Sequence, residues 1–373
     1  MNLKRIGWQP FFEQHFYVFD QKGYSPARIA KEHKGMYAVY SSWGKLTASL
    51  SGRFRYQISN RNGFPAIGDW VAVSPMPMEK KAIIHAVLPR KSRFCRKPPV
   101  SGGRKQVNID GHSVIGGGLT EEQILAANID IMFFMLSLDG NFNLRRIERY
   151  IIVGRESGAS IVIILNKSDV CPYPDKFLEQ AKTVAGDIPV HAVSALDLTN
   201  LNSLHPYFKP GHTIAISGSS GVGKSTLINA FLGKNTLNTG AVREYDGKGR
   251  HTTTWREMVL MDEGTILIDT PGMRELQIWV DEETISETFG DVENLIGQCR
   301  FSDCSHNTEP GCAVREAIEK GKLDIKRWHN YQAMKFEARY LGIRKKEKEK
   351  LVASRKKRGE PYKRCKDNFR YHT

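Results

Sequence analysis

The pattern of apolar and polar positions divides the chain into regions of different structure. Between residues 35 and 97, short alternating segments are separated by turns at Gly44 and Gly63, which predicts β-strands. The expected strands cover residues 36–42, 45–51, 53–59, 69–75 and 81–89. Five short strands in about sixty residues are typical of a small closed barrel such as an OB-fold. Residues 1–33 carry aromatic side chains without a clear period, and we interpret them as a lead-in that packs against the rest of the chain.

After a linker rich in proline, glycine and lysine at 98–112, helical periods alternate with wholly apolar segments. This alternation predicts a parallel sheet covered by helices on both faces. The expected elements are a helix over 121–128, a strand over 131–138, a helix around 144–151, a strand over 160–165 and, after the sheet, helices over 313–320 and 325–341. No apolar segment approaches the ~20 residues that span a bilayer, and the N-terminus has no signal-peptide pattern. We therefore expect a cytoplasmic protein with no membrane partner.

A candidate phosphate-binding loop follows the apolar segment that contains Ile214 and Ile216. Residues 218–225 match G-x-x-x-x-G-K-[ST] between a predicted strand and a predicted helix. The glycines let backbone N–H groups turn toward phosphate oxygens at the positive end of the helix. Lys224 would reach the β- and γ-phosphates, and Ser225 would ligate Mg²⁺. The residues expected to contact phosphate and Mg²⁺ are Gly218, Ser219, Ser220, Gly221, Val222, Gly223, Lys224, Ser225 and Thr226.

Two further motifs indicate that the base of the nucleotide is guanine. Asn166, Lys167 and Asp169 form N-K-x-D directly after a predicted strand. The Asp169 carboxylate can accept two hydrogen bonds from the N1–H and N2–H₂ edge that adenine lacks. Asn166 can contact N7, and the methylene stem of Lys167 can cover the base face. Ser194 and Ala195 end the next apolar segment, where a backbone N–H can contact the guanine O6.

Residues after the phosphate loop are candidates for a nucleotide-sensing switch. Thr253 lies in a glycine-rich, charged stretch and is the candidate threonine ligand of Mg²⁺. Asp269 and Gly272 form D-x-x-G after an apolar strand, so Asp269 would hold Mg²⁺ through water and the Gly272 N–H would contact the γ-phosphate. N-K-x-D precedes the phosphate loop, whereas most GTPases have the opposite order. A circular permutation explains this order, because the termini of a domain often lie close together.

The catalytic residue has no standard candidate. Many GTPases place a water-orienting Gln directly after D-x-x-G, and this chain has Met273 there. A thioether cannot orient water, so we expect slow intrinsic turnover. His251, close to Thr253, is our candidate for the substitute, acting together with Lys224 and Thr253. The alternative is that His251 contacts RNA or has no role.

Cys299, Cys304, His306 and Cys312 lie within fourteen positions of a turn-rich segment. Three thiolates and one imidazole form a tetrahedral zinc set, and a segment with little core of its own needs such a cross-link. All four residues would be committed to the metal, so we expect one structural Zn²⁺ without an open catalytic position. Free buried thiols or a redox pair are the alternatives.

The charge of the chain adds a candidate partner. The net charge is +15, and residues 344–373 hold 13 Lys/Arg against 4 Asp/Glu, which is +9. A basic tail without an apolar face favours nucleic acid over membrane, and the alternative is a solubilising tail. Basic and aromatic residues of the barrel could form a stacking face for RNA, or could be half-buried residues beside a solvated surface. They are Trp43, Arg53, Phe54, Arg55, Tyr56, Arg61, Arg90, Lys91, Arg93, Phe94, Arg96 and Lys97.

The barrel, the permuted motif order and the trailing C-x₄-C-x-H-x₅-C together resemble the ribosome small-subunit-dependent GTPase A family (RsgA/YjeQ). The resemblance covers about residues 35–341. It implies a late assembly factor of the small (30S) ribosomal subunit, one that binds rRNA and GTP or GDP and whose GTP hydrolysis the subunit stimulates. It also implies guanine contacts from Asn166, Lys167 and Asp169 and zinc binding by the Cys₃His set.

The predicted architecture is multidomain: an all-β OB-fold barrel, an α/β P-loop GTPase domain that is circularly permuted, and an α-helical zinc-binding domain. We expect a monomer that hydrolyses GTP. One alternative is an RNA-binding assembly scaffold in which the nucleotide is a structural ligand, and another is a permuted GTPase that acts on the large subunit. The predicted divisions are a lead-in at 1–33, the barrel at 34–97, the linker at 98–112, the GTPase domain at 113–280, the zinc domain at 281–345 and a basic tail at 346–373.

Overall fold

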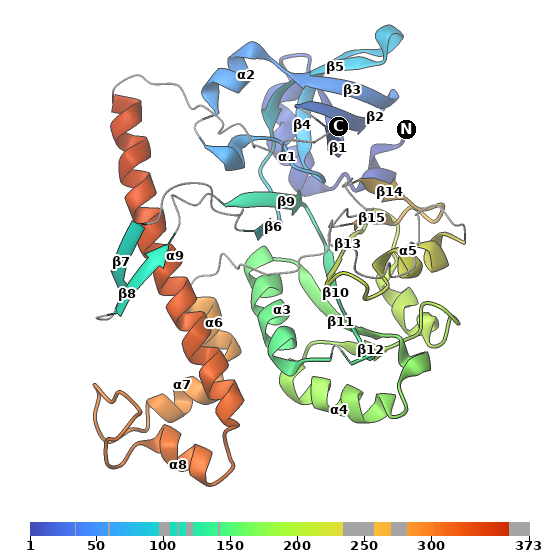
Figure 1. Cartoon of the computed structure of the whole chain (residues 1–373). Helices are drawn as coiled ribbons and strands as arrows, with labels where there is room; N and C mark the ends of the chain where they lie inside the picture. Colours follow the sequence, from blue (N-terminus) through green and yellow to red (C-terminus); the bar gives the residue numbers. More distant parts are fainter. Residues whose placement is uncertain are drawn as a thin grey trace, which may run out of the picture.

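The computed structural model describes residues 1–33, 35–58, 60–96, 105–109, 112–116, 122–140, 142–233, 257–269 and 282–357. Within these ranges the chain forms an N-terminal β-barrel, a central α/β domain and a C-terminal helical region (Figure 1). In the same ranges no helix is long and apolar enough to cross a membrane.

Five strands close the N-terminal barrel in the order β1-β2-β3-β5-β4, and β4 pairs back to β1. β3 and β5 are parallel, whereas the other neighbouring strands are antiparallel. Ile29, Val39, Val71 and Ile84 belong to the apolar cluster of this barrel. The predicted OB-type barrel is therefore confirmed. Its strands are β1 Ser25–His33, β2 Met36–Ser41, β3 Gly44–Leu50, β4 Trp70–Met76 and β5 Lys81–Val87.

Two parts of the barrel differ from the prediction. β1 lies inside the segment interpreted as a lead-in, so the barrel begins before residue 34. The predicted strand at 53–59 is wrong, because Gly52–Gln57 form the helix α2. Ser51 caps this helix by accepting a hydrogen bond from the Phe54 N–H at 3.1 Å, and Phe54 packs against the barrel core. Short 3₁₀ helices η2 Arg61–Gly63 and η3 Pro77–Glu79 complete the connections.

The residues before β1 pack against the barrel, as predicted. They form the 3₁₀ helix η1 Leu3–Ile6 and the helix α1 Pro10–Asp20. Phe12 and Phe16 of α1 are buried with the ring of Trp70, and Trp8 meets Trp70 edge-on at 4.7 Å between ring centroids. This aromatic cluster fastens the N-terminus to the outer side of β4.

The central domain is a six-stranded sheet in the order β12-β11-β10-β13-β15-β14, parallel except for β14. Every residue of β10 is buried, and its alternate side chains enter two different apolar clusters. Met132, Phe134 and Leu136 pack with the helices α3 and α4, whereas Phe133 and Met135 pack with α5. The predicted parallel sheet with helices on both faces is confirmed. The elements are β10 Ile131–Ser137, α3 Leu144–Ser157, β11 Ser160–Asn166, η4 Ser168–Val170, α4 Pro174–Ala185, β12 Val190–Ala192, η5 Leu201–Tyr207, β13 Thr213–Gly218, α5 Lys224–Leu232, β14 Met258–Leu260 and β15 Ile266–Asp269.

The connection between barrel and sheet contains two strand pairs that the sequence did not predict. The helix expected over 121–128 is wrong, because Gln123–Ala127 form the strand β9, which pairs with β6, Arg93–Arg96. The buried Leu125, Ala126 and Phe94 hold this pair in place. The strand β7, Lys105–Ile109, lies within the segment predicted as a linker and pairs with β8, His112–Gly116, which begins at the last residue of that segment.

A fully buried arginine connects the barrel to the sheet. Arg28 of β1 is 1% exposed, and its guanidinium donates to the carbonyls of Ile6, Gly68 and Asn128 and to the Thr213 hydroxyl. Burial lowers its pKa to about 10, although Asp130 and Asp69 oppose the shift. Because Thr213 begins β13, the barrel is attached directly to the strand that leads into the phosphate loop.

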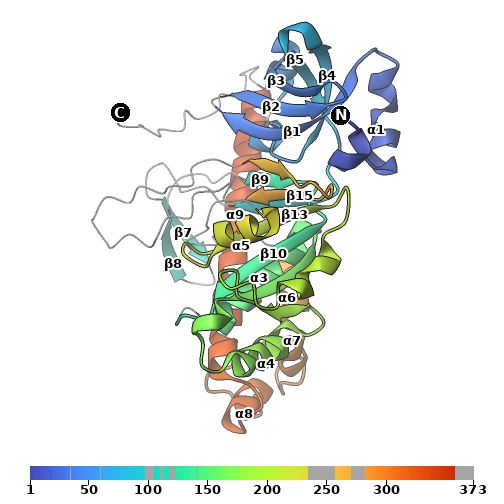
Figure 2. The same cartoon turned by 90° about the vertical axis from the view of Figure 1, so that its right-hand side faces the viewer.

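The C-terminal region packs on α3. In Figures 1 and 2, α3 lies between α9 and the sheet, and α5 covers the opposite face. α9 continues beyond residue 341, where the predicted helix ended. The helices are α6 Glu282–Thr288, α7 Gly290–Ile296, α8 Ala313–Glu319 and α9 Ile325–Lys357.

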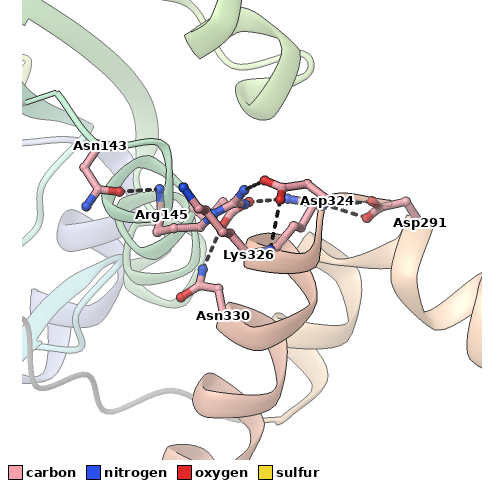
Figure 3. Close-up of polar contacts among 8 residues, drawn as sticks. Asn143, Arg145, Asp291, Asp324, Lys326 and Asn330 are labelled. Carbon is pink, nitrogen blue, oxygen red and sulfur yellow. Dashed lines mark hydrogen bonds and ion pairs between the residues drawn. The ribbon is translucent and has the colours of Figure 1, made fainter. Parts of the chain in front are cut away.

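A buried carboxylate holds α9 against α3, and three of the residues in this network, Arg145, Asp291 and Asn330, are labelled in Figure 3. Glu148 of α3 is 0% exposed and accepts hydrogen bonds from Arg145, Arg327 and Asn330. The Arg327 guanidinium also binds both oxygens of Asp291, at 2.8 and 2.7 Å, so its charge is shared between two helices. A buried carboxylate with this many donors stabilises the interface only while all partners are present.

We expect Glu148→Ala to loosen this interface, because it leaves the buried ends of Arg145 and Arg327 with fewer acceptors. The loss should be about 3 kcal/mol, seen as faster hydrogen exchange of the α9 amides. Glu319→Ala is the matched control, because its Arg315 pair is exposed on both sides and should change exchange by less than about 1 kcal/mol. Equal effects of the two substitutions would show that Glu148 does not anchor α9.

Candidate nucleotide and metal sites

The phosphate loop leaves the carboxyl end of β13, an interior strand of the sheet, and enters α5. Gly223 has a φ of +94°, and a Cβ there would lie 2.3 Å from the Nδ2 of Asn166, so conformation and packing both require glycine. The Lys224 Nζ donates to the carbonyls of Gly218 and Ser219 at 2.9 and 2.8 Å. The loop therefore folds around its own lysine, as expected for the motif.

Lys224 and Asp269 share a buried environment that suits a phosphate and a cation. Burial lowers the pKa of Lys224, and the nearby Asp269 opposes this shift. Burial also raises the pKa of Asp269, with Lys224 opposing, and the Oδ1 of Asp269 has no hydrogen-bond partner among the described residues. A buried carboxylate oxygen without a donor is costly unless a ligand or ion satisfies it. Asp269 at the end of β15 and Ser225 at the start of α5 therefore fit a Mg²⁺ ion.

The side chain of Asn166 joins the three nucleotide motifs. It is 2% exposed and lies at the carboxyl end of β11. Its Nδ2 donates to the Val222 carbonyl at 2.7 Å, and its Oδ1 accepts from the Ala195 N–H at 3.0 Å. One amide thus connects N-K-x-D to the phosphate loop and to the Ser-Ala loop. One proton of Nδ2 is not used by these bonds, so contact with the base remains possible.

The Ser-Ala loop is held by its own serine. Ser194 is 0% exposed, and its Oγ accepts from the N–H groups of Leu196 and Asp197, both at 3.3 Å. The Ser194 N–H donates to the Thr199 carbonyl at 3.0 Å. Asp169, by contrast, is exposed in η4, so its carboxylate is accessible to a ligand.

One acidic residue at this edge of the sheet was not predicted from the sequence. Asp139 follows β10 and pairs with Lys167 of N-K-x-D. The available signal was its position, because β10 and β11 were both predicted and the carboxyl ends of parallel strands meet at one edge. Three other candidates, His251, Thr253 and Gly272, lie outside the described residues, as does Met273.

The predicted metal ligands meet at one point. The ligand atoms of Cys299, Cys304, His306 and Cys312 all lie within 4.8 Å of one another. The His306 Nδ1 is 3.5 Å from the sulfurs of Cys299 and of Cys312, and its ring meets Trp328 of α9 edge-on. Three sulfurs and one imidazole nitrogen can hold one tetrahedral metal ion.

Only part of the predicted RNA face is on the surface. Arg90 is bound through two nitrogens to the buried Asp69, and Phe94 is 0% exposed, so these two residues are structural and the prediction for them is wrong. Arg53, Arg55 and Tyr56 of α2 are exposed, the last at 78%. Trp43 is 49% exposed. Lys97 lies outside the described residues.

The sheet order and the position of each motif define a class of protein. The phosphate loop, N-K-x-D and the Ser-Ala loop follow β13, β11 and β12 of one parallel sheet, but N-K-x-D comes first along the chain. This is a P-loop GTPase domain with circularly permuted connectivity. The model of the RsgA GTPase family matches residues 87–279, and the chain belongs to this family.

Relatives agree with this assignment over most of the chain. A small ribosomal subunit biogenesis GTPase RsgA from Opitutus terrae is 42% identical over 353 residues, which is 92% of each chain. A protein of the same name, numbered 2, from Vibrio vulnificus is 38% identical over 88% of this chain and 86% of its own. Among solved structures, YjeQ from Thermotoga maritima is 25% identical, with a TM-score of 0.56 over 84% of this chain and 98% of that one. YloQ, described as a circularly permuted GTPase, shares the fold with a TM-score of 0.53 at 20% identity, over 85% of this chain and 95% of its own.

We expect removal of the metal to unfold the segment between α7 and α8 while nucleotide binding stays nearly intact. The four ligands supply this segment with its cross-link, whereas the phosphate loop is held by β13 and Asn166. The measurement is hydrogen exchange of residues 297–312 and the affinity for GDP, before and after a chelator and after adding zinc back. Unchanged exchange without metal would contradict a structural metal, and lost GDP binding would contradict the independence of the two sites.

Proposed function

We propose that this protein is a GTPase that acts in late maturation of the small (30S) ribosomal subunit. It binds rRNA and hydrolyses GTP to GDP and phosphate, and the subunit stimulates the hydrolysis. The supporting observation is that Asn166 joins the phosphate loop, N-K-x-D and the Ser-Ala loop into one site, in a chain 42% identical to a relative named for this activity.

Different residues bind the base, the phosphates and the Mg²⁺ ion. Asp169 recognises the guanine edge, a backbone N–H of the Ser-Ala loop contacts O6, and Asn166 contacts N7. Residues 218–226 bind the phosphates, with Lys224 at the β- and γ-phosphates. Mg²⁺ supplies charge neutralisation at the phosphates, held by Ser225, Thr253 and Asp269, and the Gly272 N–H senses the γ-phosphate.

The metal of the Cys₃His set is Zn²⁺, since thiolates and imidazole suit zinc. Its role is structural, because the four side chains complete a tetrahedral set and leave no open position for catalysis. The exposed Arg53, Arg55 and Tyr56 of α2 form part of the rRNA-binding surface, with the basic tail as a further contact. The protein acts in the cytoplasm as a monomer. The proposed domain divisions at 97, 112, 280 and 345 follow the changes of pattern in the sequence.

The test is GTP turnover by the full chain alone, with small subunits and with large subunits. We expect slow turnover alone, because Met273 stands where a water-orienting Gln is usual, and strong stimulation by small subunits only. Unchanged turnover with small subunits would instead support an RNA-binding scaffold with a structural nucleotide. Stimulation by large subunits only would place the protein on the other subunit.

The same assay tests His251 as the catalytic residue. We expect His251→Ala to lower the stimulated turnover at least about 100-fold while the affinity for GTP is retained, because the imidazole orients the attacking water only once the loop is placed by the ribosome. His329→Ala, at an exposed position of α9, is the matched control and should behave as wild type. Stimulation of His251→Ala to the wild-type rate would contradict this role.

A further inference from the structure

The pairing of Asp139 with Lys167 lies on the path that a nucleotide must take across the sheet. Asp169 and Ala195 follow β11 and β12, and the phosphate loop follows β13, with β10 between β11 and β13. A nucleotide with its base at the first two loops and its phosphates at the third must cross the ends of β11 and β10. Lys167, after β11, reaches to Asp139, after β10, and so spans this interval.

The carboxylate of Asp139 is itself held in place. Its Oδ1 accepts from the Ser137 hydroxyl at 2.7 Å, and its Oδ2 accepts from the Lys167 ammonium. Ser137 is 1% exposed and pairs with Asn166 in the register of β10 and β11. The Asp139 carboxylate is therefore held at a fixed position relative to the strand end that carries N-K-x-D. Burial raises the pKa of Asp139, but the hydrogen bonds from Lys167 and Ser137 outweigh this and hold it below the usual value, so the group is anionic at neutral pH.

The Asp139 carboxylate restricts the motion of the Lys167 side chain. The Lys167 backbone has a φ of +65°, a left-handed conformation that is uncommon for a residue other than glycine, and its side chain is 29% exposed. A lysine side chain free to rotate loses much entropy when it is ordered against a ligand. Fixing the ammonium at Asp139 orders the four methylene groups before the ligand arrives, which is preorganisation.

We propose that Asp139 is a positioning residue for guanine-nucleotide binding: it holds the Lys167 ammonium so that the lysine stem is already extended beneath the nucleoside. Asp139 acts through Lys167 and does not itself contact the base. This inference rests on the proposed guanine-nucleotide site and adds to it the residue that orders its lysine.

The test is a double-mutant cycle on the full-length protein with fluorescent GDP as the probe. Asp139→Asn keeps the shape but removes the charge, and we expect it to weaken GDP binding about three- to tenfold, as expected for freeing one long side chain. In a Lys167→Met background, Asp139→Asn should have no further effect, because the group that it positions is absent. Asp139→Glu should restore part of the affinity. Asp187→Asn is the matched control. It makes the same change at an exposed residue before the amino end of β12, away from the carboxyl ends of the strands, and should bind GDP like wild type.

Three results would overturn the inference. Unchanged or tighter GDP binding by Asp139→Asn would mean that the pair does not order the lysine, or that it withholds the lysine from the ligand. An equal loss in the wild-type and Lys167→Met backgrounds would mean that Asp139 acts by another route. If wild type itself fails to bind GDP, the proposed guanine site is wrong and this inference fails with it. If only this inference is wrong, wild type still binds GDP, so the two failures can be told apart. Should Asp139→Asn not fold, as judged by its thermal midpoint, Ser137→Ala removes the second donor of the carboxylate and is expected to give a smaller loss that again vanishes with Lys167→Met.

Discussion

The nucleotide site depends on one buried amide. Asn166 is the only part of N-K-x-D that lies inside the protein, and both polar atoms of its side chain are engaged, one with the phosphate loop and one with the Ser-Ala loop. A Cβ at position 223 would lie 2.3 Å from this amide, so the phosphate loop and the guanine motif fit together because Gly223 leaves the space free. The phosphate contacts and the base contacts are thereby kept at a fixed separation, which a bound nucleotide requires.

The remaining parts of the chain are attached to this centre through buried charges. Arg28 ties the barrel to the first residue of β13, and Glu148 ties the C-terminal helices to α3. Each is a buried charged group that makes two hydrogen bonds to another part of the chain, Arg28 to Asn128 and Thr213 and Glu148 to Arg327 and Asn330, so each favours one arrangement of the parts over others. The permutation adds a further connection, because α6 of the C-terminal region is the next described element along the chain after β15, the strand of D-x-x-G.

The motifs and the main strands of the sheet were predictable from sequence, since wholly apolar segments ending in N-K-x-D, Ser-Ala or the phosphate loop leave few other folds. The four metal ligands were predictable because they lie close together in the sequence.

The strand β1 was not predictable, because Arg28 occupies a buried position and breaks the alternation that marks a strand. The segment predicted as a strand over 53–59 contains strand-forming side chains, yet the cap at Ser51 begins the helix Gly52–Gln57. Asp139 had only a positional signal, the end of a predicted strand, because its pairing with Lys167 depends on β10 and β11 being neighbours. Arg90 could be recognised as structural only from its contact with the buried Asp69.

We infer that the phosphate loop, N-K-x-D and the Ser-Ala loop together form a site selective for guanine. The most direct measurement is calorimetric titration of the full chain, loaded with Mg²⁺, with GDP and with ADP. We predict that GDP binds at least about 100-fold more tightly than ADP, because only guanine can donate two hydrogen bonds to the Asp169 carboxylate. Equal affinities for the two nucleotides would contradict it.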